Sequence, residues 1–406
     1  MNVPSCVKPL SLKIQQIEES QTLALAARAK ELQAAGRDVV SLTAGEPDFA
    51  TPAHVKIAAI RAIEEDFTHY TPNQGIPGLI DVIAQKFERD NNLHFRSDQI
   101  LVSCGAKHSI YNVLQAICNK GDEVVIPAPY WVSYPEIVKL ADARPIVIPT
   151  THGDHFKISP LQFRRAINAK TKAFLFNSPS NPSGTVYSQG EIEELADIVH
   201  ETGIYVISDE IYEKVIYDGA KHFSIGSIRN IADQVITVNG VSKAYAMTGW
   251  RIGYLGANKK IVEAAAKVQS QSTSNATSIS QRAAAMALSG PAADIEMMVA
   301  EFERRRDYIA GQLGKIPHLE FESPKGAFYL FPYVDKYLGK RCDGKLIRDD
   351  TALCQFFLDE EGVASIPGSA FGSKKYIRLS YACSMKDLEM AVERLKRGFR
   401  KLESSF

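Results

Sequence analysis

The chain has 406 residues, of which 45% are hydrophobic and 23% charged, as expected for a globular protein of roughly two or three domains. Its 47 Lys and Arg balance its 47 Asp and Glu, so a formal charge of zero argues against a nucleic-acid partner. No apolar run reaches the ~18 residues of a membrane span, and no signal peptide is visible. We therefore expect a cytoplasmic protein without a membrane partner, and the spacing of its 6 cysteines predicts no metal site.

Helical and apolar patterns alternate along the first three quarters of the chain. A helix is predicted at 21–36, and a second helical stretch at 108–119 follows the apolar run 99–102. The next apolar runs are rich in Val, Ile and Phe with little polar alternation, which is typical of strands covered on both faces. These runs are 123–127, 144–149, 173–177, 204–208, 235–238 and 252–255, with helical stretches such as 189–201 between them. The alternation predicts an α/β fold with a mostly parallel sheet sandwiched by helices.

The pattern changes after about residue 290. A charged helix at 295–313 is followed by a helix at 350–361, a strand at 376–381 and a terminal helix at 385–402. This order predicts a smaller α+β domain. We therefore expect a segment 1–48 that packs with the small domain, a large domain 49–290 and a small C-terminal domain 291–406.

Polar residues follow the predicted strands, where ligands of open α/β sheets bind. They are Asn181, Asp209 with Tyr212, and Lys243 with Arg251. Taken singly, each has an ordinary explanation as a turn, a helix cap or a solvated side chain. Taken together, they match the needs of pyridoxal phosphate.

Pyridoxal phosphate needs a lysine amine for a Schiff base, a carboxylate at its ring nitrogen, donors at its ring hydroxyl and a cation at its phosphate. The chain supplies the amine with Lys243 and the carboxylate with Asp209. It supplies the donors with Tyr212 and Asn181, and the cation with Arg251. Arginine suits a phosphate because its planar fork binds two oxygens.

The phosphate also favours a helix N-terminus, where backbone N–H groups and the helix dipole meet it. Gly105 and Ala106 lie between the apolar run 99–102 and the helical stretch 108–119, so we expect their N–H groups at the phosphate. Trp131 follows another strand and is predicted to stack on the ring, although a core or hinge role explains it equally well.

At this point the sequence resembles the class I, fold type I pyridoxal-phosphate aminotransferases, most closely the bacterial-type aspartate aminotransferases. The resemblance covers nearly the whole chain in order. It is carried by the segments SLTAGEPDF (41–49), HYTP (69–72), PYWVSYPE (129–136), NSPSNP (177–182), SDEIY (208–212), SKAYAMTGWR (242–251) and YIRLSY (376–381).

The resemblance implies a role for each matching residue. Lys243 is expected to form the Schiff base and to move the substrate's Cα proton. Arg378 is expected to hold the α-carboxylate, helped by the Asn181 side chain and the Gly45 backbone. Tyr70 is expected to reach the phosphate in the neighbouring subunit, which implies a homodimer with shared active sites.

Lys107 is the residue on which the substrate prediction depends. Animal-type aspartate aminotransferases bind the distal carboxylate with an arginine from the other subunit, but segment 271–278 contains none. The bacterial-type group resembles this chain in placing a lysine after the phosphate-loop glycine. Because a lysine at a helix N-terminus is electrostatically unfavourable, Lys107 indicates an anionic ligand nearby. We therefore expect amino-acid and 2-oxo-acid substrates, with the amino group moving from L-aspartate to 2-oxoglutarate.

Two positions depart from some relatives. Gly240 stands where some have a phosphate-binding serine, so that hydroxyl is lost or comes from elsewhere, for example Ser242. Glu18 aligns with a lysine that part of the group uses for prephenate. Because a carboxylate repels an anionic substrate, we expect prephenate transamination only as a secondary activity.

Two alternatives stay open from the sequence. A pyridoxal-phosphate lyase or synthase on the same fold would share every cofactor residue, although Lys107 and Trp131 in their contexts disfavour it. A non-catalytic nucleotide-binding protein would need a G-x-G-x-x-G fingerprint after a strand, and none is present.

Overall fold

The computed structural model describes residues 8, 10–19, 21–342 and 344–403. Its main feature is a seven-stranded sheet with the strand order β2-β8-β7-β6-β5-β3-β4. The strands are β2 (Ile100–Ser103), β3 (Glu123–Ala128), β4 (Arg144–Pro149), β5 (Thr171–Asn177), β6 (Tyr205–Asp209), β7 (Val235–Gly240) and β8 (Gly253–Gly256). Only β8 runs antiparallel to its neighbours in this sheet, β2 and β7, so the predicted mostly parallel sheet is confirmed.

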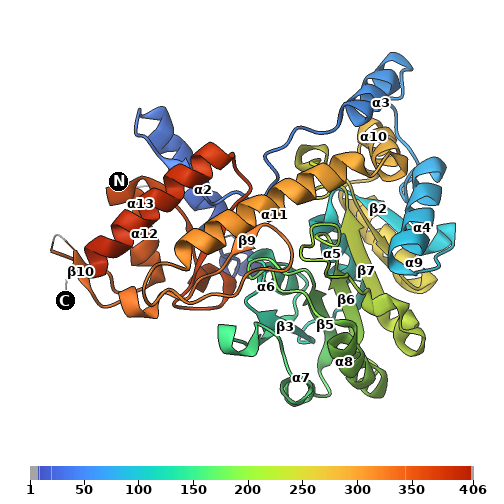
Figure 1. Cartoon of the computed structure of the whole chain (residues 1–406). Coiled ribbons are helices and arrows are strands. Elements are labelled where there is room, and N and C mark those ends of the chain that lie inside the picture. Colours follow the sequence, from blue (N-terminus) through green and yellow to red (C-terminus); the bar gives the residue numbers. More distant parts are fainter. Residues whose placement is uncertain (1–7, 9, 20, 343, 404–406) are drawn as a thin grey trace, which may run out of the picture.

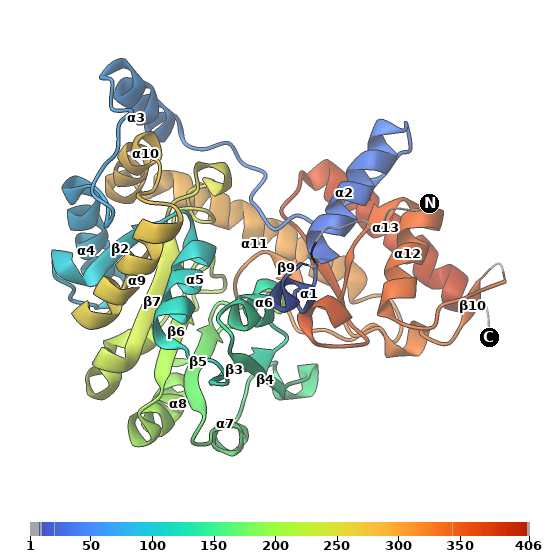
Figure 2. The same ribbon diagram turned by 180° about the vertical axis from the view of Figure 1, so that it is seen from behind.

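Helices cover both faces of this sheet, as Figures 1 and 2 show from opposite sides. The helices are α3 (Ala53–Glu64), α4 (Pro77–Asn91), α5 (Ala106–Ile117), α6 (Ser133–Leu140), α7 (Pro160–Ala166), α8 (Gln189–Thr202), α9 (Lys259–Ser272) and α10 (Ser278–Ser289). Strand β5 shows why its apolar run does not alternate. Ala173 and Leu175 pack in one core with α5, α6 and α9, whereas Phe174 and Phe176 pack in another with α7 and α8.

The C-terminal elements pack around a further hydrophobic core, which also includes residues of the segment after β6 such as Tyr212 and Tyr217. They are α11 (Ala293–Leu313), β9 (Tyr329–Leu330), β10 (Arg341–Cys342), β11 (Lys345–Leu346), α12 (Asp350–Glu361), β12 (Val363–Ala364), β13 (Ile366–Pro367), β14 (Ile377–Ser380) and α13 (Met385–Glu403). Strands β13, β14 and β9 form an antiparallel sheet, and α11 runs from the large sheet to this body (Figure 1). In α13, Leu388, Val392, Leu395 and Phe399 are buried at helical spacing, so one face of the helix packs on the core.

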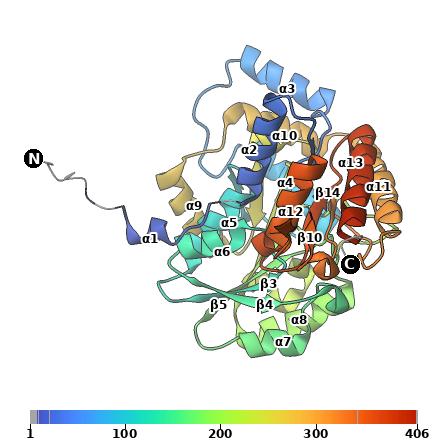
Figure 3. The same cartoon turned by 90° about the vertical axis from the view of Figure 1, so that its left-hand side faces the viewer.

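The N-terminal elements lie against these C-terminal elements. They are α1 (Leu12–Gln15), α2 (Gln21–Ala34) and β1 (Val40–Ser41). Strand β1 pairs in parallel with β12, and α2 contacts β1, β12 and β13. Helix α1 lies beside α6 instead (Figure 3). The domain boundaries at 48/49 and 290/291 stay a prediction. No helix in the described ranges is long and apolar enough to cross a membrane.

Candidate active site

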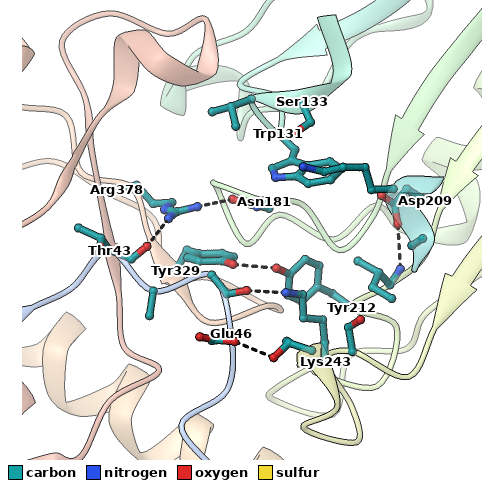
Figure 4. A pocket seen from close by; sticks show the side chains of 18 of the residues that line it. Thr43, Glu46, Trp131, Ser133, Asn181, Asp209, Tyr212, Lys243, Tyr329 and Arg378 are labelled. Carbon is teal, nitrogen blue, oxygen red and sulfur yellow. Dashed lines mark hydrogen bonds between the residues drawn. The ribbon is translucent and has the colours of Figure 1, made fainter. Parts of the chain in front are cut away.

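A pocket of about 610 Å³ lies at the carboxyl ends of β5, β6 and β7 (Figure 4). Most of the site residues expected from the sequence line it together. They are Gly45, Ala106, Lys107, Trp131, Asn181, Asp209, Tyr212, Lys243, Arg251 and Arg378. The strand ends meet here because parallel strands present their carboxyl ends at one edge of a sheet.

Lys243 follows β7, and its Nζ donates a hydrogen bond to the Gly45 carbonyl. Burial, together with the positive charges of Arg251 and Arg378, lowers the pKa of Lys243 to about 8 against the opposing effects of Glu46 and Asp209. At pH 7 about a tenth of the amine is therefore in the neutral, nucleophilic form, far more than for a lysine with the ordinary pKa of about 10.4.

Asp209 ends β6 and is 3% exposed. Its Oδ2 accepts a hydrogen bond of 2.8 Å from the Tyr134 hydroxyl, and its Oδ1 accepts one of 3.2 Å from the Ile211 N–H. Burial raises the pKa of Asp209 to about 6, although these hydrogen bonds and Lys243 oppose the shift. Above that pH the pocket therefore contains a buried, oriented carboxylate.

Arg378 enters the pocket from β14 and is 2% exposed. It donates to the Asn181 side-chain oxygen at 3.0 Å and to the Thr43 carbonyl at 2.8 Å, and its guanidinium lies over the Tyr329 ring at 4.4 Å. Its Nε has no hydrogen-bond partner, and it forms no ion pair with a carboxylate among the residues that the structure describes. A buried cation of this kind is suited to binding an anionic group.

The N-terminus of α5 also lines the pocket, through Ala106 and Lys107. Gly105 caps this helix with φ of +92°, and a Cβ there would lie 2.4 Å from an Arg251 guanidinium nitrogen. Only glycine lets the arginine approach so closely. Arg251 donates to the Thr248 carbonyl at 2.9 Å and to the Cys104 carbonyl at 3.3 Å. A guanidinium beside a helix N-terminus makes this end suited to a phosphate.

Gly240 carries no hydroxyl toward this end, and the structure shows a steric reason. A Cβ at Gly240 would lie 3.0 Å from the Ile252 carbonyl oxygen and 3.1 Å from the Gly253 Cα. The backbone at Ile252 and Gly253 would therefore have to shift slightly to admit a side chain. Ser242, the other candidate from the sequence, does line the pocket.

Lys107 extends over Trp131, with its Nζ 4.7 Å from the centre of the ring. Burial lowers the pKa of Lys107, and Arg251 lowers it further. Lys107 forms no ion pair with a carboxylate in the described part of the chain. Trp131 lines the pocket, where it also contacts Tyr134 edge to face at 5.3 Å.

Sequence reasoning missed several pocket residues. Tyr329, from β9, shares a hydrogen bond of 2.7 Å with Tyr212, and Tyr134, from α6, holds Asp209. Tyr134 lies within the recognised segment 129–136, which was the available signal, whereas Tyr329 lies in an apolar run that looks like core. Thr43, Glu46 and Asn177 also line the pocket.

Two residues considered from the sequence lie elsewhere. The Tyr70 side chain is 91% exposed on the surface, so its predicted contact with a neighbouring subunit stays a prediction. Glu18 is exposed, and its backbone N–H donates to the Glu136 carboxylate at 2.9 Å.

Residues 37–395 match the family described as aminotransferase class I and II. The chain belongs to this family. Among individual aminotransferases, the chain is 47% identical to an aspartate aminotransferase of Bacillus subtilis over 97% of this chain and 99% of that protein. It is 46% identical to a bifunctional aspartate and glutamate/aspartate-prephenate aminotransferase of Petunia hybrida, over 96% of this chain and 82% of that protein.

Solved structures of other aminotransferases are similar to this structure over nearly the whole chain. The aspartate aminotransferase of Rhizobium meliloti has a TM-score of 0.94 and 40% identity, covering 97% of this chain and 100% of that one. The enzyme of Thermus thermophilus, solved with maleate, has a TM-score of 0.91 and 41% identity, with the same coverage. These similarities confirm the prediction of a class I aminotransferase of the bacterial type. They favour it over the two alternatives from the sequence, a lyase or synthase and a nucleotide-binding protein.

Proposed function

We propose that the protein is a pyridoxal-phosphate-dependent aminotransferase that moves the amino group of L-aspartate to 2-oxoglutarate, giving oxaloacetate and L-glutamate. The observation that carries the proposal is the pair of cations, Arg378 and Lys107, that line one pocket with Lys243 and have no carboxylate partner among the described residues. Two cations suit a substrate with two carboxylates. The maleate solved with the Thermus thermophilus relative is such a dicarboxylate.

The residues present fit the family cofactor. The Gly105 cradle beside Arg251 suits its phosphate, and the buried Asp209 carboxylate suits a protonated ring nitrogen. The cofactor would supply an electron sink for the amino group of the substrate, which makes the substrate Cα–H acidic. The residues proposed to hold it are Gly105, Ala106, Trp131, Asn181, Asp209, Tyr212, Lys243 and Arg251.

Arg378 would then fix the α-carboxylate, and Lys107 would fix the distal one. Lys243 Nζ, freed by the substrate, would take up the Cα proton as a general base and return it as a general acid. The first 2-oxo acid would leave before the second substrate binds, so the kinetics are expected to be ping-pong.

A panel of half-reactions tests the proposal. The absorbance of the bound cofactor is followed after adding aspartate, glutamate, alanine or phenylalanine in turn, and prephenate is offered as a second amino acceptor. Aspartate and glutamate should convert the cofactor rapidly, and the other amino acids slowly. Equal rates with all four would overturn the dicarboxylate assignment.

We further propose a cytoplasmic homodimer in which Tyr70 completes the partner's site. The 91% exposure of this tyrosine supports a role outside its own subunit. Sedimentation of the holoenzyme should give twice the chain mass, and a monomer with full activity would contradict shared sites.

Replacing Lys107 by serine should separate the two carboxylate contacts. We expect kcat/KM for aspartate and glutamate to fall roughly ten- to a hundredfold, because a charge-assisted contact is worth about 1.5–3 kcal/mol. Alanine should be spared. Arg378→Ala is the matched contrast and should weaken every amino acid alike, because each carries an α-carboxylate. An equal loss on acidic and neutral substrates in Lys107→Ser would assign Lys107 to the phosphate side or to structure.

The cofactor-free protein should take up pyridoxal phosphate faster as pH rises. Only the neutral Lys243 amine attacks an aldehyde, and the pKa of Lys243 is about 8, so the neutral fraction grows as pH passes through that value. The uptake rate, followed by absorbance in stopped flow, should have its midpoint near pH 8. A midpoint above about pH 10, the ordinary lysine range, would contradict the lowered pKa.

A further inference from the structure

The segment from Asp209 to Glu213 has two chemical faces. Asp209 and Tyr212 line the pocket. Glu210 and Glu213 instead bond to side chains behind it, and they are 1% and 8% exposed. Two buried carboxylates therefore alternate in sequence with the two pocket residues. Burying carboxylates is costly unless partners compensate them.

The partners come from three parts of the chain. Asn91, at the end of α4, donates to Glu210 at 3.0 Å and to Glu213 at 2.6 Å. Lys86, one turn earlier, contacts Glu213 and donates to the Asn91 side-chain oxygen at 2.6 Å. Glu210 also bonds to Ser208 at 2.9 Å, to Ser224 at 2.7 Å and to His222 at 2.8 Å. We call this set the rear network: Lys86, Asn91, Ser208, Glu210, Glu213, His222 and Ser224.

Each carboxylate of the rear network has a basic partner, because Lys86 contacts Glu213 and His222 bonds to Glu210. Burial opposes the charged form of Glu213, but Lys86, His222 and Asn91 together outweigh burial and lower the pKa of that carboxyl. Burial also opposes the charged form of His222, but Glu210 and Glu213 together outweigh burial, so the pKa of His222 is raised overall. Glu210, Glu213 and His222 lie close enough to share a metal ion, yet the Lys86 ammonium already lies at Glu213 as their cation.

The network lies directly behind the Asp209 carboxylate. Glu210 is its chain neighbour and disfavours its ionisation, whereas Lys243 and the Tyr134 hydroxyl favour it. The other charged group beside Lys86 is Asp90, which pairs with Arg89 at 2.9 Å and with Lys214 at 3.0 Å. Tyr245 and Tyr254 lie near Glu213, and burial raises the pKa of both, so they stay neutral. Lys86 and His222 are therefore the basic groups that face Glu213 and Glu210.

We propose that Lys86 and Glu213 are positioning residues: the charge-balanced rear network holds segment 209–213 so that Asp209 stays ionised and directed into the pocket. The inference rests on the proposed function, because it concerns the carboxylate assigned to the cofactor's ring nitrogen. The inference predicts that removing either charge changes the ionisation of Asp209, in opposite directions. Removing the Lys86 charge leaves an unbalanced carboxylate behind Asp209, which favours its protonated form. Removing the Glu213 charge leaves an unbalanced ammonium, which favours the ionised form.

The test uses Lys86→Met, Glu213→Gln and the double variant, with Glu361→Gln as the matched control. Glu361 is also a buried carboxylate, paired with Arg397 at 2.6 Å, but it lies in α12 away from the pocket. The pyridoxal-phosphate affinity of each cofactor-free protein is measured from acid to alkaline pH, together with Tm and the acid limb of kcat/KM.

In Lys86→Met the acid limb should move up by about one pH unit, and cofactor affinity below neutral pH should fall about tenfold. In Glu213→Gln the acid limb should move down in pH and the cofactor affinity below neutral pH should rise. In the double variant both quantities should return toward the wild-type values. Glu361→Gln should lower Tm and leave both pH profiles unchanged.

Several results would overturn the inference. One is a lower Tm in Lys86→Met and Glu213→Gln with pH profiles like those of the wild type. Another is a shift of the pH profiles of the two variants in the same direction, which a purely structural role would produce. If Lys86→Met does not fold, the sign of the shift in the near-isosteric Glu213→Gln decides. A wild-type protein that takes up no cofactor would overturn the proposed function and this inference with it.

Discussion

Replacing Lys243 by alanine should lower kcat by at least three orders of magnitude, roughly 4 kcal/mol or more. Lys243 is the lysine whose Nζ lies at the Gly45 carbonyl, in the same pocket as Asp209 and Arg378 (Figure 4), and whose pKa is lowered to about 8. It supplies both the amine that holds the cofactor and the base that takes the Cα proton. Its removal therefore deletes two functions in one step. Steady-state turnover of aspartate measures the loss.

Chemical trapping is the control for this prediction. Borohydride reduction of the holoenzyme should fix the cofactor on a peptide that contains Lys243. The pocket is also lined by Lys30 and Lys107, which serve as internal comparisons. A label on either of them, or turnover in Lys243→Ala near the wild-type rate, would show that the strand-end assignment is wrong.

Replacing Asp209 by alanine should lower the rate of Cα–H cleavage by about a hundredfold or more, because breaking a buried ion pair costs about 3–5 kcal/mol. Cofactor affinity should fall less, since Arg251 and the N-terminus of α5 remain. Single-turnover kinetics with aspartate and equilibrium titration with pyridoxal phosphate measure the two effects separately. Turnover within about tenfold of wild type would contradict the role of Asp209.

Tyr134→Phe is the milder companion of this variant. It keeps the Asp209 carboxylate but removes the 2.8 Å hydrogen bond that favours its ionised form. The pKa of Asp209 should rise, so activity should be lost at a higher pH on the acid side while the alkaline rate is largely kept. A uniform loss at every pH would indicate displaced geometry instead.

The parts of the site that the sequence could predict are those at strand ends. Asp209 ends β6 and Lys243 comes soon after β7, and a parallel sheet brings such positions together whatever the rest of the chain does. The direction of β8 could not be predicted, because an apolar run of four residues carries no sign of its orientation. The actual ends of the strands also differ by one or two residues from the apolar pattern.

The parts of the site that could not be predicted depend on contacts between distant segments of the chain. Tyr329 reaches Tyr212 from β9, 117 residues further along the chain, and it lies in an apolar run that packing alone would explain. Lys86 is another case. A lysine in an amphipathic helix is ordinarily solvated, yet this one is 1% exposed because Glu213 meets it from another element. Both cases depend on a tertiary partner that no local pattern contains.

The pairing of β1 with β12 has a consequence for the order in which the site is assembled during synthesis. The Thr43 carbonyl that holds Arg378 is separated from it by 335 residues, and the Gly45 carbonyl that holds Lys243 is separated from that lysine by 198. Contacts of such high sequence separation form late, after their loop-closure entropy has been overcome. The first fifty residues leave the ribosome long before their partners exist. The large sheet can therefore form before the pocket does, and a competent site is completed only when nearly the whole chain has been synthesised.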